Sequence, residues 1–327
     1  MAVLVTGGAG YIGSHTVRAL REAGRDVVAL DSLEFGHVEA IPGIAFVKGD
    51  ISDVALITDT IATYNVDSII HFAAYKAAGE SMFMPARYFD NNVTNAHAML
   101  KAAAQAGVRR IVFSSTAAVY GTPDVVPVVE TATLRPESPY GESKLMFERI
   151  LKWFDYAHDV RSVSLRYFNA AGAAMEGGLG EDWTVTLNLV PIVMKAALER
   201  RGPVEVFGTD YPTPDGTAIR DYIHVDDLSA AHVLALRYLE EGGETTAINL
   251  GTGVGSSVKQ VLDTTERISG VRVPQIMSPR RAGDPVQVFA DNTTALAVLG
   301  WTPVYGLEEI IQSAWTWHST HPNGFRS

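Results

Sequence analysis

A tyrosine and a lysine, Tyr140 and Lys144, stand four residues apart in a Pro-Tyr-Gly-Glu-Ser-Lys segment. If this segment is helical, both side chains leave one face, about one turn apart. A free tyrosine has a pKa of about 10 and is a poor base at neutral pH, but a neighbouring cation favours the phenolate and lowers that pKa. The pair therefore suits the abstraction of a proton from an alcohol, although many helices carry the same spacing on their surfaces.

Hydroxyl side chains stand upstream of this pair, at the end of an apolar run. Ser114, Ser115 and Thr116 directly follow an Ile-Val-Phe run that is typical of a buried strand. In open α/β sheets, ligands bind at the carboxyl ends of the strands. We therefore expect a strand-end hydroxyl, the tyrosine and the lysine to form an acid–base set at that edge of the sheet. The alternative is a polar strand end that only caps the next element.

A glycine-rich loop begins at the end of the first apolar run of the chain. Gly7, Gly10 and Gly13 follow the apolar residues 3–5 in G-x-x-G-x-x-G spacing, and a helical pattern comes after them. This spacing is a variant of the dinucleotide fingerprint, in which glycines permit a tight turn and close backbone approach. The N-terminus of the following helix offers free N–H groups and a partial positive charge to a pyrophosphate.

Two acidic residues extend the dinucleotide prediction. Asp31 ends the second apolar run, eighteen residues after Gly13, where a carboxylate accepts both ribose hydroxyls of adenosine and repels a 2′-phosphate. That position favours NAD over NADP. Asp50 follows the third run, where an adenine edge would lie, and its carboxylate is suited to accept from the exocyclic amine. A turn residue is the alternative for each of the two acids.

Alternating strand and helix patterns position these groups. We expect strands over residues 2–5, 27–30, 45–47, 68–72 and 110–113, and helices over residues 12–23 and 96–106. Such alternation with continuous apolar strands predicts an α/β fold with a doubly wound parallel (Rossmann) sheet. From about Gly172 glycine and proline become frequent, which indicates a second, smaller α/β domain. The predicted division is 1–171 for NAD and 172–327 for the substrate, with some later segments returning to the first domain.

The composition excludes several classes of protein. The chain has 327 residues, a formal net charge of −11 and no cysteine. The negative charge disfavours nucleic acid and anionic membranes as partners, and the missing cysteines exclude disulfides, thiolate nucleophiles, iron–sulfur clusters and cysteine-ligated zinc. The sequence contains no uncharged apolar run long enough to span a membrane and begins without a signal-peptide pattern, so we expect a cytoplasmic protein.

Several motifs together resemble the extended short-chain dehydrogenase/reductase superfamily, and within it the UDP-glucose 4-epimerases. The glycine loop and Tyr-x-x-x-Lys are shared across the superfamily. The segments that point more narrowly to the epimerases are residues 71–76, 90–92, 166–169, 220–225, 249–251, 280–281 with Asp284, and 299–301. The resemblance spans nearly the whole chain. It implies an isomerase of galactose metabolism that uses NAD and binds a UDP-hexose in its second domain.

The resemblance implies a role for each catalytic residue. Tyr140 would take the proton of the sugar 4-hydroxyl as hydride passes to NAD, and Thr116 would hydrogen-bond O4 of the sugar. Lys144 would hold the nicotinamide ribose and lower the pKa of the tyrosine. Hydride then returns to the other face of a transient 4-keto sugar, so that UDP-glucose and UDP-galactose interconvert. This cycle requires strong binding of the nucleotide and looser contacts to the hexose.

The resemblance also assigns the two binding sites. Implied cofactor contacts, besides Tyr140 and Lys144, are Gly7, Gly10, Tyr11, Ile12, Gly13, Asp31, Ser32, Asp50, Ile51, Phe72, Ala73, Ala74, Lys76, Asn91, Ser114, Tyr167 and Phe168. Implied substrate contacts, besides Thr116 and Tyr140, are Lys76, Asn169, Asn188, Leu189, Val204, Phe207, Arg220, Arg281, Asp284 and Val288. Two guanidiniums suit a diphosphate and a carboxylate suits ribose hydroxyls, while a surface ion pair is the alternative for each arginine taken singly.

Two positions depart from the epimerase pattern. The segment 32–37 after Asp31 is compact and lacks the asparagine that often follows this acid, which bears on the adenosine-ribose contacts. Val288 stands where some epimerases carry tyrosine on the wall of the hexose pocket. The smaller side chain predicts an enlarged pocket, and from it we predict that UDP-GlcNAc and UDP-GalNAc are also accepted.

Other functions stay open. A nucleotide-sugar 4,6-dehydratase or decarboxylase is the nearest alternative, but dehydratases typically carry acids directly after the strand-end threonine, and Ala117-Ala118 follow Thr116 here. A non-catalytic NAD-binding regulatory protein is the alternative from another class. We expect no metal site, because His224 and His232 lack a short ligand spacing.

The assembly is predicted from the resemblance alone. Proteins of this kind pair helices such as those expected over residues 96–106 and 142–153 across a two-fold axis. We therefore expect a homodimer, with burial of the apolar helix faces against the sheet as the alternative.

Overall fold

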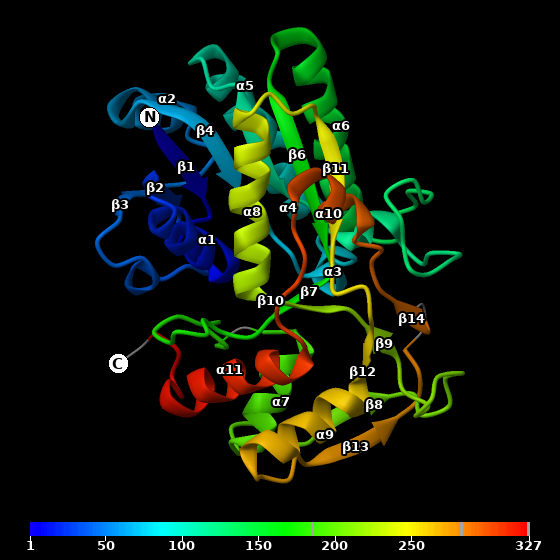
Figure 1. Ribbon diagram of the computed structural model, residues 1–327. Helices are drawn as coiled ribbons and strands as arrows, with labels where there is room; N and C mark the ends of the chain where they lie inside the picture. The colour runs from blue at the N-terminus through cyan, green and yellow to red at the C-terminus, as the bar shows by residue number, and fades with distance from the viewer. Residues whose placement is uncertain (185, 282–283, 326–327) are drawn as a thin grey trace.

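The computed structural model describes residues 1–184, 186–281 and 284–325. Within them, a seven-stranded sheet forms the centre of the larger part of the molecule, and its strands are parallel (Figure 1). The strand order is β11-β6-β5-β4-β1-β2-β3. The strands are β1 (Ala2–Thr6), β2 (Asp26–Asp31), β3 (Ala45–Lys48), β4 (Val66–His71), β5 (Arg110–Ser114), β6 (Arg161–Tyr167) and β11 (Thr246–Leu250). The doubly wound parallel sheet predicted from the sequence is confirmed.

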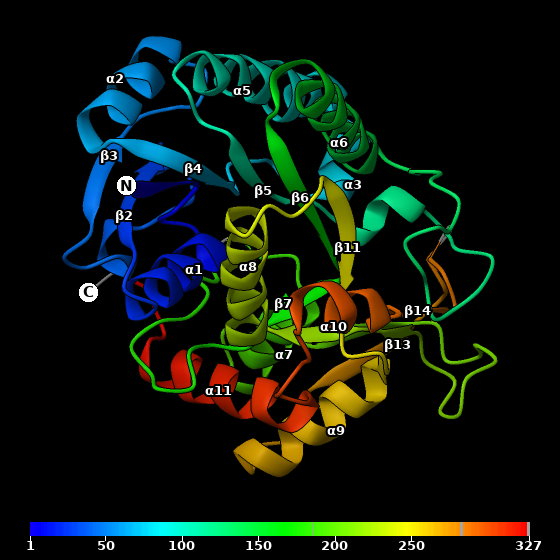
Figure 2. The ribbon, with the colours of Figure 1, turned by 45° about the horizontal axis from the view of Figure 1, so that its top comes forward.

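Helices cover both faces of this sheet (Figure 2). One face carries α1 (Tyr11–Glu22) and α8 (Val225–Glu240), and the other carries α2 (Val54–Tyr64), α5 (Ala96–Gln105) and α6 (Pro139–His158). A separate hydrophobic core lies under each layer, because strands buried on both faces present apolar side chains in both directions.

The order of the strands places the functional edge. β1 lies between β2 and β4, so the chain first extends the sheet in one direction and then in the other. The carboxyl ends of the three strands lead into the glycine loop, Asp31 and the segment after His71. In doubly wound sheets such a reversal opens a crevice that binds ligands. The strands and helices predicted from the sequence in this part agree with the observed ones to within about two residues.

The second part of the molecule is built from helices and very short strands. It contains α7 (Leu189–Ala197), α9 (Val258–Ser269) and α11 (Leu307–Thr320), which pack around a third core and lie at the bottom of Figure 1. β7 (Asn169–Ala171) pairs with β10 (Tyr222–His224), and β8 (Val204–Phe207) pairs with β13 (Gln275–Ser278). β9 (Ile219–Arg220) lies between β12 (Ser256–Ser257) and β14 (Gln287–Val288). Short helices complete the chain at the 3-10 turns η1 (Val38–Ala40) and η3 (Ala117–Tyr120), the π-helical segment η2 (Asp90–Asn95), α3 (Ala78–Ser81), α4 (Pro85–Phe89) and α10 (Thr293–Leu299).

The chain crosses between the two parts more than once. After β10 it returns to the large sheet, where α8 covers one face and β11 forms the edge beside β6. The predicted division at residue 171 stays a prediction. The return of α8 and β11 to the large sheet is the structural fact that bears on it. Among the helices of the described ranges, none has the length and apolarity needed to cross a bilayer.

Candidate active site

The helix that carries the tyrosine and the lysine begins just before them. Ser138 is the N-cap of α6, and its hydroxyl accepts the backbone N–H of Gly141 at 3.2 Å. Pro139 occupies the first turn, where its missing N–H costs nothing. A Cβ on Gly141 would lie 2.7 Å from the carbonyl oxygen of Ala118, so glycine allows the helix to pack against η3. The helical spacing predicted for Tyr140 and Lys144 is thereby present.

Lys144 reaches back to the end of β5. Its Nζ donates to the carbonyl oxygen of Ser114 at 2.8 Å and lies 4.9 Å from the centre of the Phe113 ring. The residue is only 3 % exposed. Burial lowers the pKa of Lys144 to about 7, while the negative charge of Glu148 acts in the opposite direction. The ammonium and the free amine are therefore both accessible near neutral pH.

Thr116 and Tyr140 face each other across the same edge. The threonine Oγ1 accepts the N–H of Ala118 at 3.1 Å, which leaves its hydroxyl hydrogen available for donation. Burial raises the pKa of Tyr140, and a hydrogen bond with the Thr116 side chain opposes that rise. Burial is thus the larger influence on Tyr140, and the role predicted for Lys144 in lowering the pKa of the tyrosine stays a prediction.

The glycine loop has the geometry that a pyrophosphate requires. Gly7 has φ +72°, and a Cβ there would lie 2.7 Å from the backbone nitrogen of Ala73. A Cβ on Gly13 would collide with the carbonyl oxygen of Gly7. Gly10 is the N-cap of α1, and Tyr11 anchors the helix start by donating to the carbonyl oxygen of Gly172 at 2.7 Å. Backbone that only glycine permits at these places forms a cradle at a helix N-terminus, so the loop fits a dinucleotide.

Asp31 is buried beside this loop. Its two oxygens accept the backbone N–H groups of Ala9 at 3.0 Å and Leu33 at 2.8 Å. Burial raises the pKa of Asp31, and these two donors lower it in part. A Cβ on Gly36 would lie 2.8 Å from one carboxylate oxygen, so the compact segment 32–37 folds directly over the acid. Asp50 has the geometry of a turn residue, accepting the N–H of Ser52 at 2.8 Å.

A clasp that the sequence did not indicate crosses the end of β1. Glu34, in the segment after β2, pairs with Arg87 of α4 at 2.6 Å and accepts the hydroxyl of Tyr75 at 2.8 Å. Arg87 also lies over the Tyr75 ring, 3.9 Å from its centre, and pairs with Glu80 at 3.0 Å. We call Glu34, Tyr75 and Arg87 the clasp. It joins the segments that follow β2 and β4, the strands on either side of β1.

Asn91 was the predicted cofactor contact of its segment, and the structure adds its neighbour Asn92. Asn92 is buried and exchanges hydrogen bonds with the backbone of Tyr75 at 2.9 and 3.0 Å. Its amide also donates to Ser143 of α6 at 3.1 Å. Asn91 donates to Asn92 at 3.0 Å. Asn92 therefore holds the segment after β4 against the catalytic helix, a role that depends on contacts distant in the sequence.

Most other predicted cofactor residues follow the carboxyl ends of strands of the large sheet. Ser114 at the end of β5 exchanges a hydrogen bond of 2.5 Å with the Tyr167 hydroxyl at the end of β6. The remaining members of this set are Ile12, Ser32, Ile51, Phe72, Ala73, Ala74 and Phe168. Lys76 projects from the same edge, its Nζ 3.9 Å from a carboxylate oxygen of Glu181. The structure thus brings the predicted cofactor set to one edge.

The predicted substrate residues gather around β9 and β14. Arg220 pairs with Asp284, and the guanidinium of Arg281 lies over the Phe207 ring, 3.8 Å from its centre. Val288 is the register partner of Arg220. Its side chain and that of Phe168 both pack against a small buried cluster of Val119, Tyr120, Val128 and Leu145, the last of which adjoins Lys144 in the sequence. One end of this set is therefore cationic and the other lies near the catalytic residues.

Three further substrate predictions meet different surroundings. Asn188 is the N-cap of α7, ahead of Leu189, and its amide donates to Glu181 at 3.3 Å. Asn169 is exposed, and its amide donates to the carbonyl oxygen of Asp221 at 3.0 Å, which leaves its side-chain oxygen open. The prediction for Val204 is wrong for its side chain, which is 1 % exposed and packs into the third core.

The histidines weighed as metal ligands have structural contacts. His224 is the N-cap of α8 and accepts the N–H of Asp226 at 3.1 Å. His232 bonds to the carbonyl oxygen of Leu228 at 2.8 Å, and His71 bonds to the Thr6 hydroxyl at 2.7 Å. Across the described residues, no group of three or more histidine or acidic side chains is arranged to hold a metal ion.

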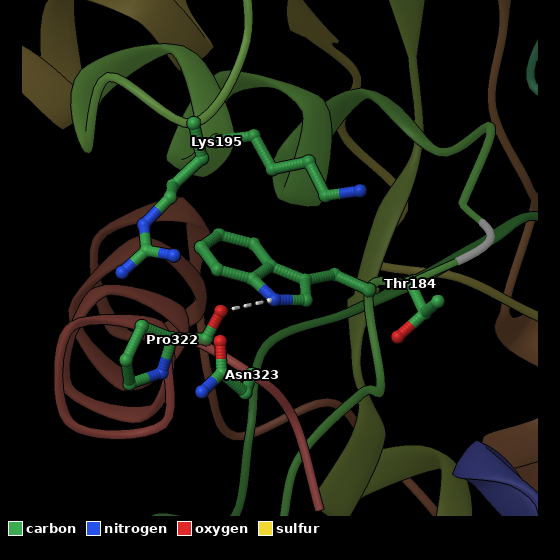
Figure 3. A pocket seen from close by; sticks show the side chains of 6 residues that line it. Thr184, Lys195, Pro322 and Asn323 are labelled. Carbon is green, nitrogen blue, oxygen red and sulfur yellow. Dashed lines mark hydrogen bonds between the residues drawn. The ribbon is translucent and has the colours of Figure 1, made fainter. Parts of the chain in front are cut away.

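A cavity of about 340 Å³ lies elsewhere, between α7 and the segment after α11 (Figure 3). Lys195, Thr184, Pro322 and Asn323 surround it, and the Trp183 indole donates to the carbonyl oxygen of Pro322 at 3.2 Å. None of the predicted catalytic, cofactor or substrate residues lines it. The chemistry of the edge described above, and not the volume of this cavity, therefore defines the candidate active site.

The chain is similar to known proteins over nearly its whole length. The family model described as "NAD dependent epimerase/dehydratase family" matches residues 3–251. The chain is 46 % identical to a UDP-glucose 4-epimerase of Lacticaseibacillus casei over 99 % of both chains. A crystal structure of UDP-glucose 4-epimerase from Bifidobacterium longum in complex with NAD⁺ and UDP matches with a TM-score of 0.93 and 40 % identity, covering 99 % of this chain and 100 % of the other. The UDP-Glc/GlcNAc 4-epimerase of Campylobacter jejuni matches with a TM-score of 0.87 and 39 % identity, covering 98 % and 99 %.

The chain belongs to the NAD dependent epimerase/dehydratase family. The relatives that match it over nearly their whole length are UDP-glucose 4-epimerases. The predictions of an extended short-chain dehydrogenase/reductase fold, of NAD as cofactor and of an isomerase are confirmed. The comparisons favour the epimerase over the dehydratase, the decarboxylase and the non-catalytic alternative.

Proposed function

We propose that this chain interconverts UDP-glucose and UDP-galactose by inverting C4 of the hexose, with Tyr140, Lys144 and Thr116 as the catalytic residues. The observation that carries the proposal is the convergence of these three side chains beside a glycine loop shaped for a dinucleotide. Bound NAD supplies reversible acceptance of hydride from C4 of the sugar.

Proton transfer falls to the chain's own residues. Tyr140 takes the proton of the 4-hydroxyl and returns it after the sugar has turned, so one group acts as base and then as acid. The single hydroxyl hydrogen of Thr116, which is shared with the phenolic oxygen in the free protein, is donated to the sugar O4 in the complex and stabilises the charge that develops there. Lys144 holds the nicotinamide ribose from the end of β5. Ala117 and Ala118 follow Thr116, so the acid–base pair that water elimination needs is missing there.

The second part of the molecule supplies the anchor. Arg220 and Arg281 hold the diphosphate, Asp284 and Asn188 hold the uridine end, and Phe207 offers an aromatic face. Charge-assisted contacts of this kind are strong and directional, whereas the hexose meets mainly small and apolar walls. That asymmetry lets the keto sugar turn while the nucleotide stays bound.

One assay tests the main proposal. Purified protein is mixed with UDP-galactose without added NAD, and formation of UDP-glucose is followed. We expect turnover, because family members use the dinucleotide without net consumption. Release of NAD on denaturation, with no isomerisation of any UDP-hexose, would instead identify a non-catalytic binding protein.

We also propose that UDP-GlcNAc and UDP-GalNAc are accepted, because Val288 stands where some epimerases carry the larger tyrosine on the wall of the hexose pocket. Val288→Tyr should narrow the pocket, lowering kcat/KM for UDP-GlcNAc while UDP-glucose turnover continues. Gln287→Tyr, one residue earlier and exposed, is the control. No turnover of UDP-GlcNAc by the unaltered chain sinks this extension.

The proposed assembly is a cytoplasmic homodimer formed through α5 and α6. In support, α6 exposes Trp153 at 69 % and Tyr156 at 85 %, with Met146 on the same helix at 36 %. Light scattering after size exclusion should give twice the chain mass, and Trp153→Lys with Tyr156→Lys should reduce it to one. A monomeric unaltered chain contradicts the assembly without touching the catalytic proposal.

A further inference from the structure

Glu148 is a buried carboxylate directly behind the acid–base centre. It stands four residues after Lys144 on α6, about one turn along the same face. Its side chain and that of its partner Arg166 on β6 are each 3 % exposed. A pair of buried charges is weak support for stability, because desolvation offsets the attraction between them. A buried pair at this place therefore calls for another reason.

The carboxylate of Glu148 joins three elements. Its Oε1 accepts the Ser115 hydroxyl at 2.5 Å and Nε of Arg166 at 3.0 Å, and its Oε2 accepts Nη2 of Arg166 at 2.6 Å. Arg166 in turn donates to the Tyr120 hydroxyl at 2.9 Å, and Tyr120 donates to Asn249 of β11 at 2.6 Å. Four charge-assisted hydrogen bonds, two of them from the bidentate pair, and the neutral bond from Tyr120 to Asn249 thus link α6 to the residue after β5, to β6, to η3 and to β11.

These contacts bracket the catalytic residues in the sequence. Ser115 lies between Ser114, whose carbonyl oxygen holds Lys144, and Thr116. A shift of Ser115 would therefore move two neighbouring groups together: the Ser114 carbonyl oxygen that accepts from Lys144, and the Thr116 hydroxyl that is proposed to bind the sugar. Misplacement of about 1 Å can cost a hundredfold in rate, so a group that holds this strand end acts on the reaction without touching the sugar.

Glu148 also faces Lys144 as a charge. The other groups around the ammonium are the Ser114 carbonyl and Phe113 ring on β5, His71 on β4 and, through the Ser114 hydroxyl, Tyr167 on β6, while Tyr140 stands one helical turn before Lys144 on α6. His71 is neutral at physiological pH because burial lowers its pKa to about 3. Glu148 is the acidic group among these neighbours that favours the charged lysine.

We propose that Glu148 is a positioning residue of the acid–base centre, which with Arg166 fixes the Thr116 strand end against the catalytic helix and keeps the Lys144 ammonium charged. This inference rests on the proposed roles of Thr116, Tyr140 and Lys144.

The test compares Glu148→Gln with Glu148→Gln/Arg166→Met, both assayed as NAD-loaded protein from pH 6 to 9. Gln keeps the shape and an acceptor for Ser115 but removes the charge, and the double variant avoids an unpaired buried arginine. In both we expect kcat per bound NAD to fall severalfold, KM for UDP-galactose to stay unchanged, and the alkaline limb of kcat to move down by about one pH unit. A purely structural role would not move that limb.

Asp67→Asn is the matched control. Asp67 pairs with Arg110 at 2.9 Å near the amino ends of β4 and β5, at the edge of the sheet opposite the candidate active site. Its pH profile should equal that of the unaltered enzyme. An unchanged profile and kcat in the Glu148 variants would overturn the inference, and so would a loss explained wholly by less folded, NAD-loaded protein. Absence of epimerisation in the unaltered chain would refute the proposed function, a result distinct from either of these.

Discussion

Thr116 and Lys144 are 7 % and 3 % exposed; Thr116 stands two residues after β5, Lys144 stands on α6, and both elements contribute to the same hydrophobic core. The side chains of Arg220 and Asp284, at the other end of the candidate site, are 18 % and 29 % exposed. Arg220 belongs to the two-residue strand β9, and Asp284 precedes the two-residue strand β14. Proton and hydride transfer need atoms held in one geometry, whereas a nucleotide must enter and leave. The difference indicates that rigidity is concentrated where bonds change.

The largest effect is expected at the rigid end. Tyr140→Phe removes the proton acceptor while leaving the ring and its packing, so kcat should fall by about 10²–10⁴-fold. NAD content and the melting temperature should remain close to those of the unaltered protein. Tyr156→Phe, an exposed position on the same helix, is the control. Retained turnover in Tyr140→Phe would contradict the assignment of Tyr140 as the proton acceptor at the rigid end of the site.

A smaller effect of a different kind is expected at the anchor. Arg220→Ala removes charge-assisted contacts worth about 1.5–3 kcal/mol, so KM for UDP-galactose should rise roughly ten- to hundredfold with little change in kcat. Arg280→Ala is the matched control, because that guanidinium pairs with Asp210 at 2.7 Å and lies over Tyr211. A loss of kcat rather than binding in Arg220→Ala would show that the anchor also positions the sugar.

Acid should weaken both parts of the molecule. Burial lowers the pKa values of His15, His224 and His232 to about 4 and those of His71 and His318 to about 3. An unfolded chain protonates histidine near about pH 6.5. The contribution of these buried histidines to the free energy of unfolding is therefore fully present above that pH. It is lost as the pH falls toward 4, because over this range only the unfolded state binds these protons. Calorimetry from pH 7.5 to 5 should show a falling Tm, and a constant Tm would contradict the assignment.

The smallest effect is expected at the clasp. Glu34→Gln removes a pair whose side chains are 45 % and 29 % exposed, and such pairs contribute only about 0.2–1 kcal/mol. We expect NAD to leave up to about fivefold faster, more visibly at low salt. Stopped-flow fluorescence of bound NADH measures the rate, and Asp124→Asn, from the exposed Asp124–Arg135 pair, is the control. An unchanged rate of NAD release would contradict the prediction that the clasp slows the departure of the cofactor.

Much of the fold and the catalytic set follows from local patterns. Apolar runs that alternate with helical periods specify a parallel sheet, because strands buried on both faces must be apolar throughout. The glycine spacing and Asp31 specify a dinucleotide edge for similarly local reasons. Tyr140 and Lys144 share a helix, so their spacing alone places them on one face. Each of these inferences depends on residues within about twenty positions of one another.

Contacts between distant segments were decided by the tertiary structure. Glu34 meets Arg87 across 53 positions, and Glu148 meets Arg166 through the packing of α6 on β6. The burial of Val204 could not be inferred either, because a short apolar strand has no marker for the core it will join. The pKa values of the catalytic pair also depend on the fold. The sequence shows a cation four residues from Tyr140, but only the folded surroundings determine that burial raises the pKa of the phenol and lowers that of the lysine. Desolvation depends on the neighbours in space, and those are fixed only when the chain has folded.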